Sequence, residues 1–238
     1  MVRRWLIVAT LVLALPLAGS AQKGHVRDLE TAFPQPEIFL QPVKYVAHTG
    51  AVTVVFRDSC VADGQPIPLC VELPPQPQTL TFEKNDVLSV VIPKKSMRNI
   101  LAKVPRFGPA LFLQNNSSSY DVGWFWVHLT TTMESPAFLD PRAVDPDTGE
   151  PLNGKLRLHL SGRGVTTSLG PWAPFTDYII FTRHGYVGRS FLRDTMKLPE
   201  DLVDAFFDND ITVRVNIHGT AKLAINSSVY ISILFEGN

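Results

Sequence analysis

The stretch ITVRVNIHGTAKLAINSSVYISILF, residues 211–235, decides the fold class of this chain. Apolar residues occupy every second position from Ile211 to Ile217 and again from Val229 to Phe235. The NSS between the two patterns is rich in turn-forming residues. Alternation with a period of two is typical of antiparallel strands that turn one face to a core and the other toward solvent. The C-terminal region therefore predicts paired antiparallel strands.

Strand patterns continue upstream of this stretch, at short spacing. GAVTVVF at residues 50–56 is rich in β-branched residues, and residues 78–93 are predicted to form a hairpin with EKND as its turn. Further strand patterns lie at 120–132, 155–161 and 177–184. The sequence therefore predicts a mostly β protein, an antiparallel β-sandwich or a jelly roll, with two short helices in its connections.

The two predicted helices have different signals. At residues 97–103, apolar side chains recur at helical spacing after Ser96, which can cap a helix, and Pro105 follows. The second helix lies within KLPEDLVDAFFDND, residues 197–210. There Pro199 suits a first helical turn, and apolar pairs four residues apart give the helix one apolar side.

The N-terminus has the pattern of a secretory signal peptide over residues 1–21. Arg3 and Arg4 precede an apolar run from residue 5 to residue 15, and small residues follow at 19–21. The run is shorter than the roughly 20 residues that a membrane-spanning helix needs. We therefore expect an exported protein, periplasmic or secreted, with no transmembrane span in the mature chain.

Residues 22–43 carry three prolines, Pro34, Pro36 and Pro42, which favour extended backbone over helix. The sequence predicts an extended arm here, followed by a single β-rich domain at residues 44–238. The full chain has 22 basic and 22 acidic side chains. Because no basic block alternates with aromatic residues, the composition predicts no nucleic-acid partner.

Cys60 and Cys70 are the only cysteines in the chain. In an exported protein the default for such a pair is a disulfide. The bond would close the loop CVADGQPIPLC. A metal pair or a redox couple has less support, because neither a C-x-x-C spacing nor a nearby histidine is present.

YDVGWFWVHL, residues 120–129, is the strongest candidate for a ligand site. In a strand, Trp124, Trp126 and His128 lie on the face opposite Phe125 and its apolar neighbours. One interpretation is an aromatic surface that stacks a sugar ring or a peptide, with Trp172 of the loop LGPWAPF beside it. The other is a central strand buried on both faces. The candidate ligand-binding residues are thus Trp124, Trp126, His128 and Trp172.

No catalytic, cofactor or metal motif accompanies these aromatic residues. The chain has no nucleophile elbow, no phosphate-binding loop and no dinucleotide fingerprint, and its histidines are not paired at metal-binding spacings. DPDTGEPLNG, residues 145–154, begins like a calcium loop but lacks the required glycine and glutamate positions. The sequence predicts no catalytic residues, no cofactor and no metal site.

These observations predict an exported, non-catalytic binding or structural protein. Its partner would be a glycan, a peptide or another protein at or beyond the cell surface. One alternative is an extracytoplasmic polysaccharide hydrolase, which needs two carboxyl groups across a cleft. The other is a surface-assembly subunit whose arm, residues 22–43, adds to a neighbour's sheet edge.

Overall fold

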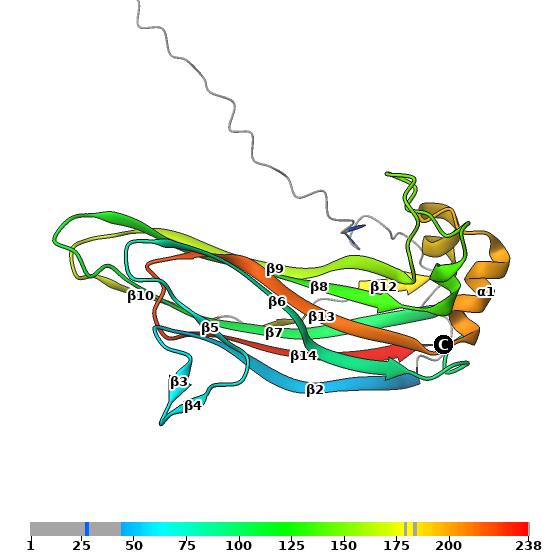
Figure 1. Cartoon of the computed structure of the whole chain (residues 1–238), viewed down its shortest axis with the longest axis horizontal. Helices are drawn as coiled ribbons and strands as arrows, with labels where there is room; N and C mark the ends of the chain where they lie inside the picture. The colour runs from blue at the N-terminus through cyan, green and yellow to red at the C-terminus, as the bar shows by residue number, and fades with distance from the viewer. Residues whose placement is uncertain (1–26, 29–43, 179, 183–184, 238) are drawn as a thin grey trace, which may run out of the picture.

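A computed structural model describes residues 27–28, 44–178, 180–182 and 185–237. The predicted signal peptide, and the predicted arm apart from Arg27 and Asp28, lie outside these residues. Two sheets lie one over the other in the described chain, with α1 (Glu200–Asp208) at one end (Figure 1). The predicted mostly β sandwich is confirmed.

The five-stranded sheet consists mainly of long antiparallel strands. Its order is β1 (Arg27–Asp28), β9 (Lys155–Leu169), β8 (Asp121–Glu134), β13 (Ile211–Lys222) and β6 (Thr79–Ile92). Only β1 runs parallel to its neighbour, with Arg27 opposite Leu158 and Asp28 opposite His159. Two residues of the predicted arm therefore lie at the β9 edge of this sheet.

The seven-stranded sheet has β7 (Ile100–Gln114), β14 (Ser227–Gly237), β2 (Lys44–Arg57) and β5 (Cys70–Glu72) in that order. Three short strands pair with the other edge of β7: β10 (Pro174–Tyr178), β11 (Phe181–Thr182) and β12 (Gly185–Gly188). The last two long strands of the chain thus occupy interior positions, β13 between β8 and β6, and β14 between β7 and β2.

The core lies between the two sheets. Phe56 of β2 contacts Phe82 of β6 and Phe125 of β8 edge to face, with ring centroids 4.8 and 4.9 Å apart. The alternation in the C-terminal strands is present as predicted, because Ile211, Ile217, Val229 and their alternate neighbours are buried. Burial of this apolar surface provides the main driving force for the sandwich.

Helices cover one end of the sandwich. The predicted second helix is confirmed as α1, which buries Leu202, Val203, Phe206 and Phe207. Phe206 stacks on Phe138 of the short 3-10 helix η3 (Pro136–Leu139) with ring centroids 5.3 Å apart. A π-helix, η4 (Phe191–Thr195), lies in the connection just before α1. Among the described residues, no helix is long and apolar enough to span a membrane.

The helix predicted at residues 97–103 is wrong, because β7 begins at Ile100. Every second residue of this strand from Leu101 to Leu113 is buried, but the series includes Lys103 and two prolines. A lysine and prolines at core positions hide strand alternation in the sequence. The remaining apolar residues happen to fall at helical spacing.

The hairpin predicted at residues 78–93 is also wrong, because β6 is one continuous strand. The expected turn is a bulge instead: the register with β13 shifts between Val215 and Ile217. Asp86 has a φ of 56°, and its backbone N–H donates to Oδ1 of Asn216 at 3.0 Å. Turn-forming residues can thus be accommodated within a strand when a side chain satisfies the released backbone donor.

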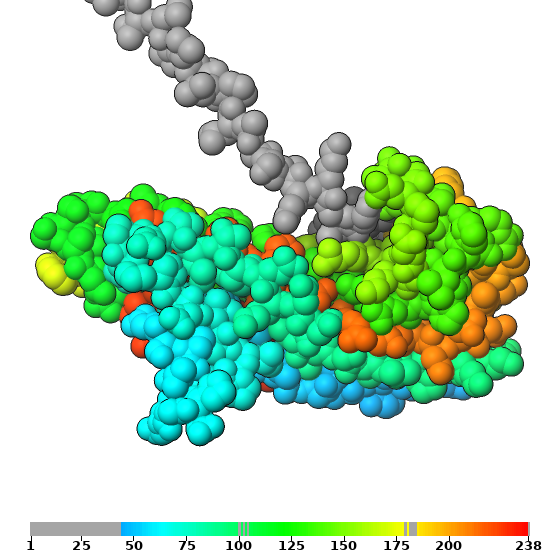
Figure 2. Space-filling view, in the orientation of Figure 1, coloured from blue at the N-terminus to red at the C-terminus, as the bar shows by residue number. Residues whose placement is uncertain are grey.

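The predicted disulfide is confirmed. Cys60 and Cys70 are bonded, with their Cα atoms 5.5 Å apart. The bond closes an excursion that contains β3 (Val61–Ala62) and β4 (Gln65–Pro66). This excursion projects from the body of the sandwich (Figure 2).

Candidate functional site on the outer face of the five-stranded sheet

The candidate site lies on the face of the five-stranded sheet that points away from the seven-stranded sheet, here called the outer face. In β8, Phe125, Val127 and Leu129 are fully buried in the core. Trp124, Trp126 and His128 alternate with them and therefore lie on the outer face. Since Trp126 is 44% exposed, this strand is not buried on both faces.

Trp126 is held flat against the neighbouring strand. A Cβ atom added to Gly164 of β9 would lie 2.0 Å from Cε3 of the indole, so the ring lies directly over this glycine. The indole Nε1 also donates to Oγ1 of Thr166 at 3.1 Å. One face of the indole is thus packed on the sheet, and a hydrogen bond fixes the orientation of the ring. The exposed area belongs to the part of the indole that does not face Gly164.

Trp124 lies beside an ion pair. The ammonium of Lys222 in β13 is 5.5 Å from the Trp124 ring centroid and 2.7 Å from Oδ1 of Asp121. The hydrogen bond from Lys222 lowers the pKa of Asp121, so its carboxyl group is ionised at neutral pH. Trp124 is only partly exposed, and its ring therefore offers less free surface than that of Trp126.

Three histidines meet on the outer face beside Trp126. His218 of β13 lies directly opposite His128, with nearly parallel rings 5.4 Å apart between centroids. His159 of β9 is 5.9 Å from His128. Burial, and then the neighbouring His218 and His159, lower the pKa of His128. Burial also lowers the pKa of His218, although Glu83 opposes the shift. His128 and His218 are therefore predominantly neutral at pH 7.

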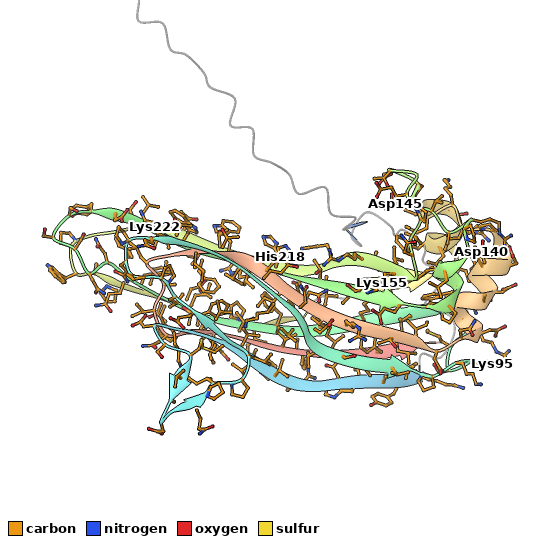
Figure 3. The ribbon with its side chains drawn as sticks, viewed as in Figure 1. Lys95, Asp140, Asp145, Lys155, His218 and Lys222 are labelled. Atoms are coloured by element: carbon orange, nitrogen blue, oxygen red, sulfur yellow. A yellow bond between two sulfur atoms is a disulfide. The ribbon has the colours of Figure 1, made fainter. Side chains whose placement is uncertain are left out.

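The sequence predicts His128 as a site residue but does not connect His159 and His218 with it. The three residues lie on separate strands, so no spacing along the chain connects them. The only available signal was strand register, since His218 sits at an outward position of the clearest predicted strand. Figure 3 shows His218 on this sheet, with Lys155 and Lys222 toward its two ends.

Trp172 is exposed but is not brought into contact with the other candidates. It follows the end of β9, which finishes at Leu169 opposite Asp121, so it lies beyond the end of the sheet. Asn115 is buried and its side-chain amide donates to the carbonyl groups of Leu169 and Gly170, which ties this loop to the end of β7. The structure records no ring contact between Trp172 and Trp124 or Trp126.

Glu83 and Glu134, two further carboxyl groups at this face, are also paired with cations. Glu83 contacts Arg157 at 4.0 Å, and Glu134 contacts Arg214 at 3.1 Å and Lys155 at 3.4 Å. Burial alone would raise the pKa of Glu134, but hydrogen bonds and charge from Arg214 and Lys155 lower it overall. Ionised, paired carboxylates are poor general acids.

A polar depression lies at the end of the outer face nearer the helices. Asp86, Glu134, Lys155 and Arg214 are among its lining residues, and its volume is about 520 Å³. Among the described residues, no group of three or more histidine, cysteine, aspartate or glutamate side chains is arranged to hold a metal ion.

In the calcium-like segment at residues 145–154, the Asp145 side chain accepts hydrogen bonds from the backbone of its own turn. Oδ1 of Asp145 accepts from the backbone N–H groups of Asp147 and Thr148, at 2.8 and 3.3 Å. This is the behaviour of a turn residue.

No protein-family model matches the sequence, and no curated protein sequence matches it either.

Proposed function

We propose that this chain is an exported binding protein that recognises a glycan on the outer face of the five-stranded sheet. The observation that carries the proposal is the indole of Trp126, which lies flat over Gly164 and is 44% exposed. A pyranose ring presents one face of C–H groups, and such a face gains contact area by stacking on a flat, immobile aromatic ring. Polar groups beside the ring, including His128, would orient the sugar hydroxyl groups.

The rigidity of Trp126 supports this function. The Thr166 hydrogen bond and the packing on Gly164 fix the ring before any ligand arrives. A preorganised ring loses less conformational freedom on binding than a mobile one. The open sheet face suits an extended, repeating ligand better than a small molecule that needs an enclosed pocket.

The test is titration of immobilised polysaccharides and soluble oligosaccharides with the protein and two variants. Trp126→Ala is expected to weaken binding at least tenfold, because it removes the stacking surface. Trp172→Ala is the matched control, since it deletes an exposed indole that lies beyond the sheet, and binding should be retained. Equal losses in both variants, or unchanged binding by Trp126→Ala, would remove the outer face as the ligand site.

Export is the second part of the proposal. Residues 1–21 have the charge and apolar pattern of a signal peptide, and the Cys60–Cys70 bond fits an oxidising compartment. The expected result in the native host is a chain recovered outside the cytoplasm and shortened at its N-terminus near residue 21. N-terminal sequencing of the recovered protein provides the measurement. An intact N-terminus in the cytoplasmic fraction would contradict export.

A surface-assembly role is a second candidate, favoured by the pairing of Arg27 and Asp28 with β9. A segment that adds to the edge of its own sheet can add to the same edge of a neighbour. Sedimentation should then show association that rises with concentration and disappears on deletion of residues 22–43. A polysaccharide hydrolase has less support, because Glu83, Glu134 and Asp121 each contact a cation.

A further inference from the structure

His128 and His218 form a cross-strand pair of imidazoles whose spacing suits a shared metal ion. Their ring centroids are 5.4 Å apart, and the ring planes differ by 19°. Two imidazoles bound at about 2.0–2.1 Å to one tetrahedral ion would have centroids about 5 Å apart. The backbone register therefore already sets the separation that shared coordination needs.

The aim of the ring nitrogens is adjustable. The χ2 torsion of histidine is broad, so the two rings, which lie nearly parallel, can turn about their Cβ–Cγ bonds toward a shared ion. The Nδ1 edge of His128 lies against Gly162, where an added Cβ atom would be 2.6 Å from Nδ1. The other nitrogen, Nε2, lies farther from this glycine and is the better placed ligand.

The ligand type also indicates which metal ions would fit the pair. Imidazole suits zinc, copper and nickel ions among the common divalent metals.

Charged side chains of both signs lie near the histidine pair. On β6, Glu83 lies opposite His218 and contacts Arg157 of β9. His159 of β9 lies on the other side of His128. At His159, β9 pairs with the short strand β1. Glu83 places a negative charge and Arg157 a positive charge near His218, so the two side chains largely balance each other there.

We propose that His128 and His218 form a two-histidine site for a late first-row divalent metal ion, with water completing the coordination. Two protein ligands are consistent with the absence, among the described residues, of a group of three or more ligand side chains arranged around one ion. The proposal does not depend on glycan binding by Trp126. The two are tested by different ligands.

The test uses NiCl₂, CuCl₂ and ZnCl₂ as probes on the full chain at pH 7.5, with calorimetry and tryptophan fluorescence as readouts. Because Trp126 lies two residues from His128, copper or nickel at the pair should quench part of the tryptophan emission in a saturable way. Zinc should bind by calorimetry with little quenching. At pH 5, protonation of the imidazoles should weaken binding at least tenfold.

Three variants decide the outcome. His128→Gln and His218→Gln should each weaken binding at least tenfold, whereas His48→Gln, which changes a histidine of β2 in the other sheet, should bind as the unsubstituted chain does. Circular dichroism of each variant checks that it is folded. The proposal is overturned if the folded His128→Gln and His218→Gln variants bind as tightly as the unsubstituted chain, or if His48→Gln loses as much affinity. It is also overturned if the unsubstituted chain shows no saturable binding.

Discussion

At the scale of single residues, Lys103 is the least expected feature of the molecule. Its side chain is fully buried between the sheets, and its ammonium nitrogen is 2.8 Å from Oγ1 of Thr131. Burial lowers its pKa from 10.5 to about 7. Burial of an amine with a single neutral partner costs free energy whenever the amine is charged.

Lys103 makes the stability of the fold depend on pH above neutrality. Its pKa in the folded state is lower than in the unfolded state, so the unfolded chain binds more protons between about pH 7 and 10.5. The free energy of unfolding should therefore rise with pH in this window, by about 1.4 kcal/mol per pH unit at most. Urea unfolding at pH 7.5 and pH 9.5 provides the measurement.

The matched variant is Lys103→Met, which keeps a long apolar side chain and removes the titrating amine. It should be more stable than the unsubstituted chain at pH 7.5 and should show much less dependence on pH up to 9.5. A pH dependence of unchanged size in the variant would assign the effect to other groups.

Gly164 is predicted to control the position of Trp126. In Gly164→Ala, the new Cβ atom would lie 2.0 Å from the indole, so the ring must leave the sheet and lose its hydrogen bond to Thr166. We expect a red shift of tryptophan emission and easier quenching by iodide. Gly170→Ala is the control, because its Cβ atom would lie 3.5 Å from Tyr120, an ordinary contact. Identical spectra for both variants would contradict the packing of Trp126 on Gly164.

At the scale of elements, strands with regular alternation were predictable and strands with a polar core residue were not. β13 and β14 were recognised because no charged residue occupies an inward position. β7 was missed because Lys103 occupies one. The prediction for β6 fails because Asp86 and its neighbours form a bulge, where the backbone N–H of Asp86 donates to Asn216 on another strand. Local sequence cannot show a partner that arrives from a distant strand.

The disulfide is predicted to stabilise the edge of the seven-stranded sheet. Cys70 begins β5, whose parallel pairing with β2 places Cys70 opposite Val55. The bond closes a loop with a sequence separation of 10, which the chain-entropy model values at roughly 2–3 kcal/mol. The double variant Cys60→Ser and Cys70→Ser should lose about that much free energy of unfolding in urea titrations. Adding reductant to the unsubstituted chain should lower its free energy of unfolding by the same amount, which would assign the loss to the disulfide. If neither the double variant nor the reduced chain loses stability, the disulfide does not stabilise this edge.

At the scale of the whole molecule, the pairing register of neighbouring strands brings the residues of the candidate site together. Trp124, Trp126 and His128 were predictable as one face of a strand, because that requires only alternation. Which residues lie beside them, Gly164, His159 and His218, depends on how β9, β8 and β13 pair. The order of residues along the chain does not reveal this pairing. The sequence predicts Trp172 beside them, whereas Trp172 lies in a loop beyond the end of β9.

The histidines of the outer face should make the protein less stable in mild acid. The pKa values of His128 and His218 are lowered in the folded state, chiefly by burial, so the unfolded chain binds more protons as the pH falls below about 6.5. The free energy of unfolding should therefore decrease between pH 7.5 and pH 5.5. His218→Gln should reduce this decrease, and His48→Gln should leave it unchanged. A decrease that is the same in all three proteins would place the acid-sensitive groups elsewhere.

The interior positions of β13 and β14 have a consequence for biosynthesis. The five-stranded sheet lacks the strand between β8 and β6, and the seven-stranded sheet lacks the strand between β7 and β2, until residues 211–237 have been translated. A nascent chain therefore cannot complete either sheet before residues 211–237 have left the ribosome, because β13 and β14 lie between strands that precede them in the chain. We therefore expect the earlier strands to expose apolar surface until that point, and such surface is prone to aggregation.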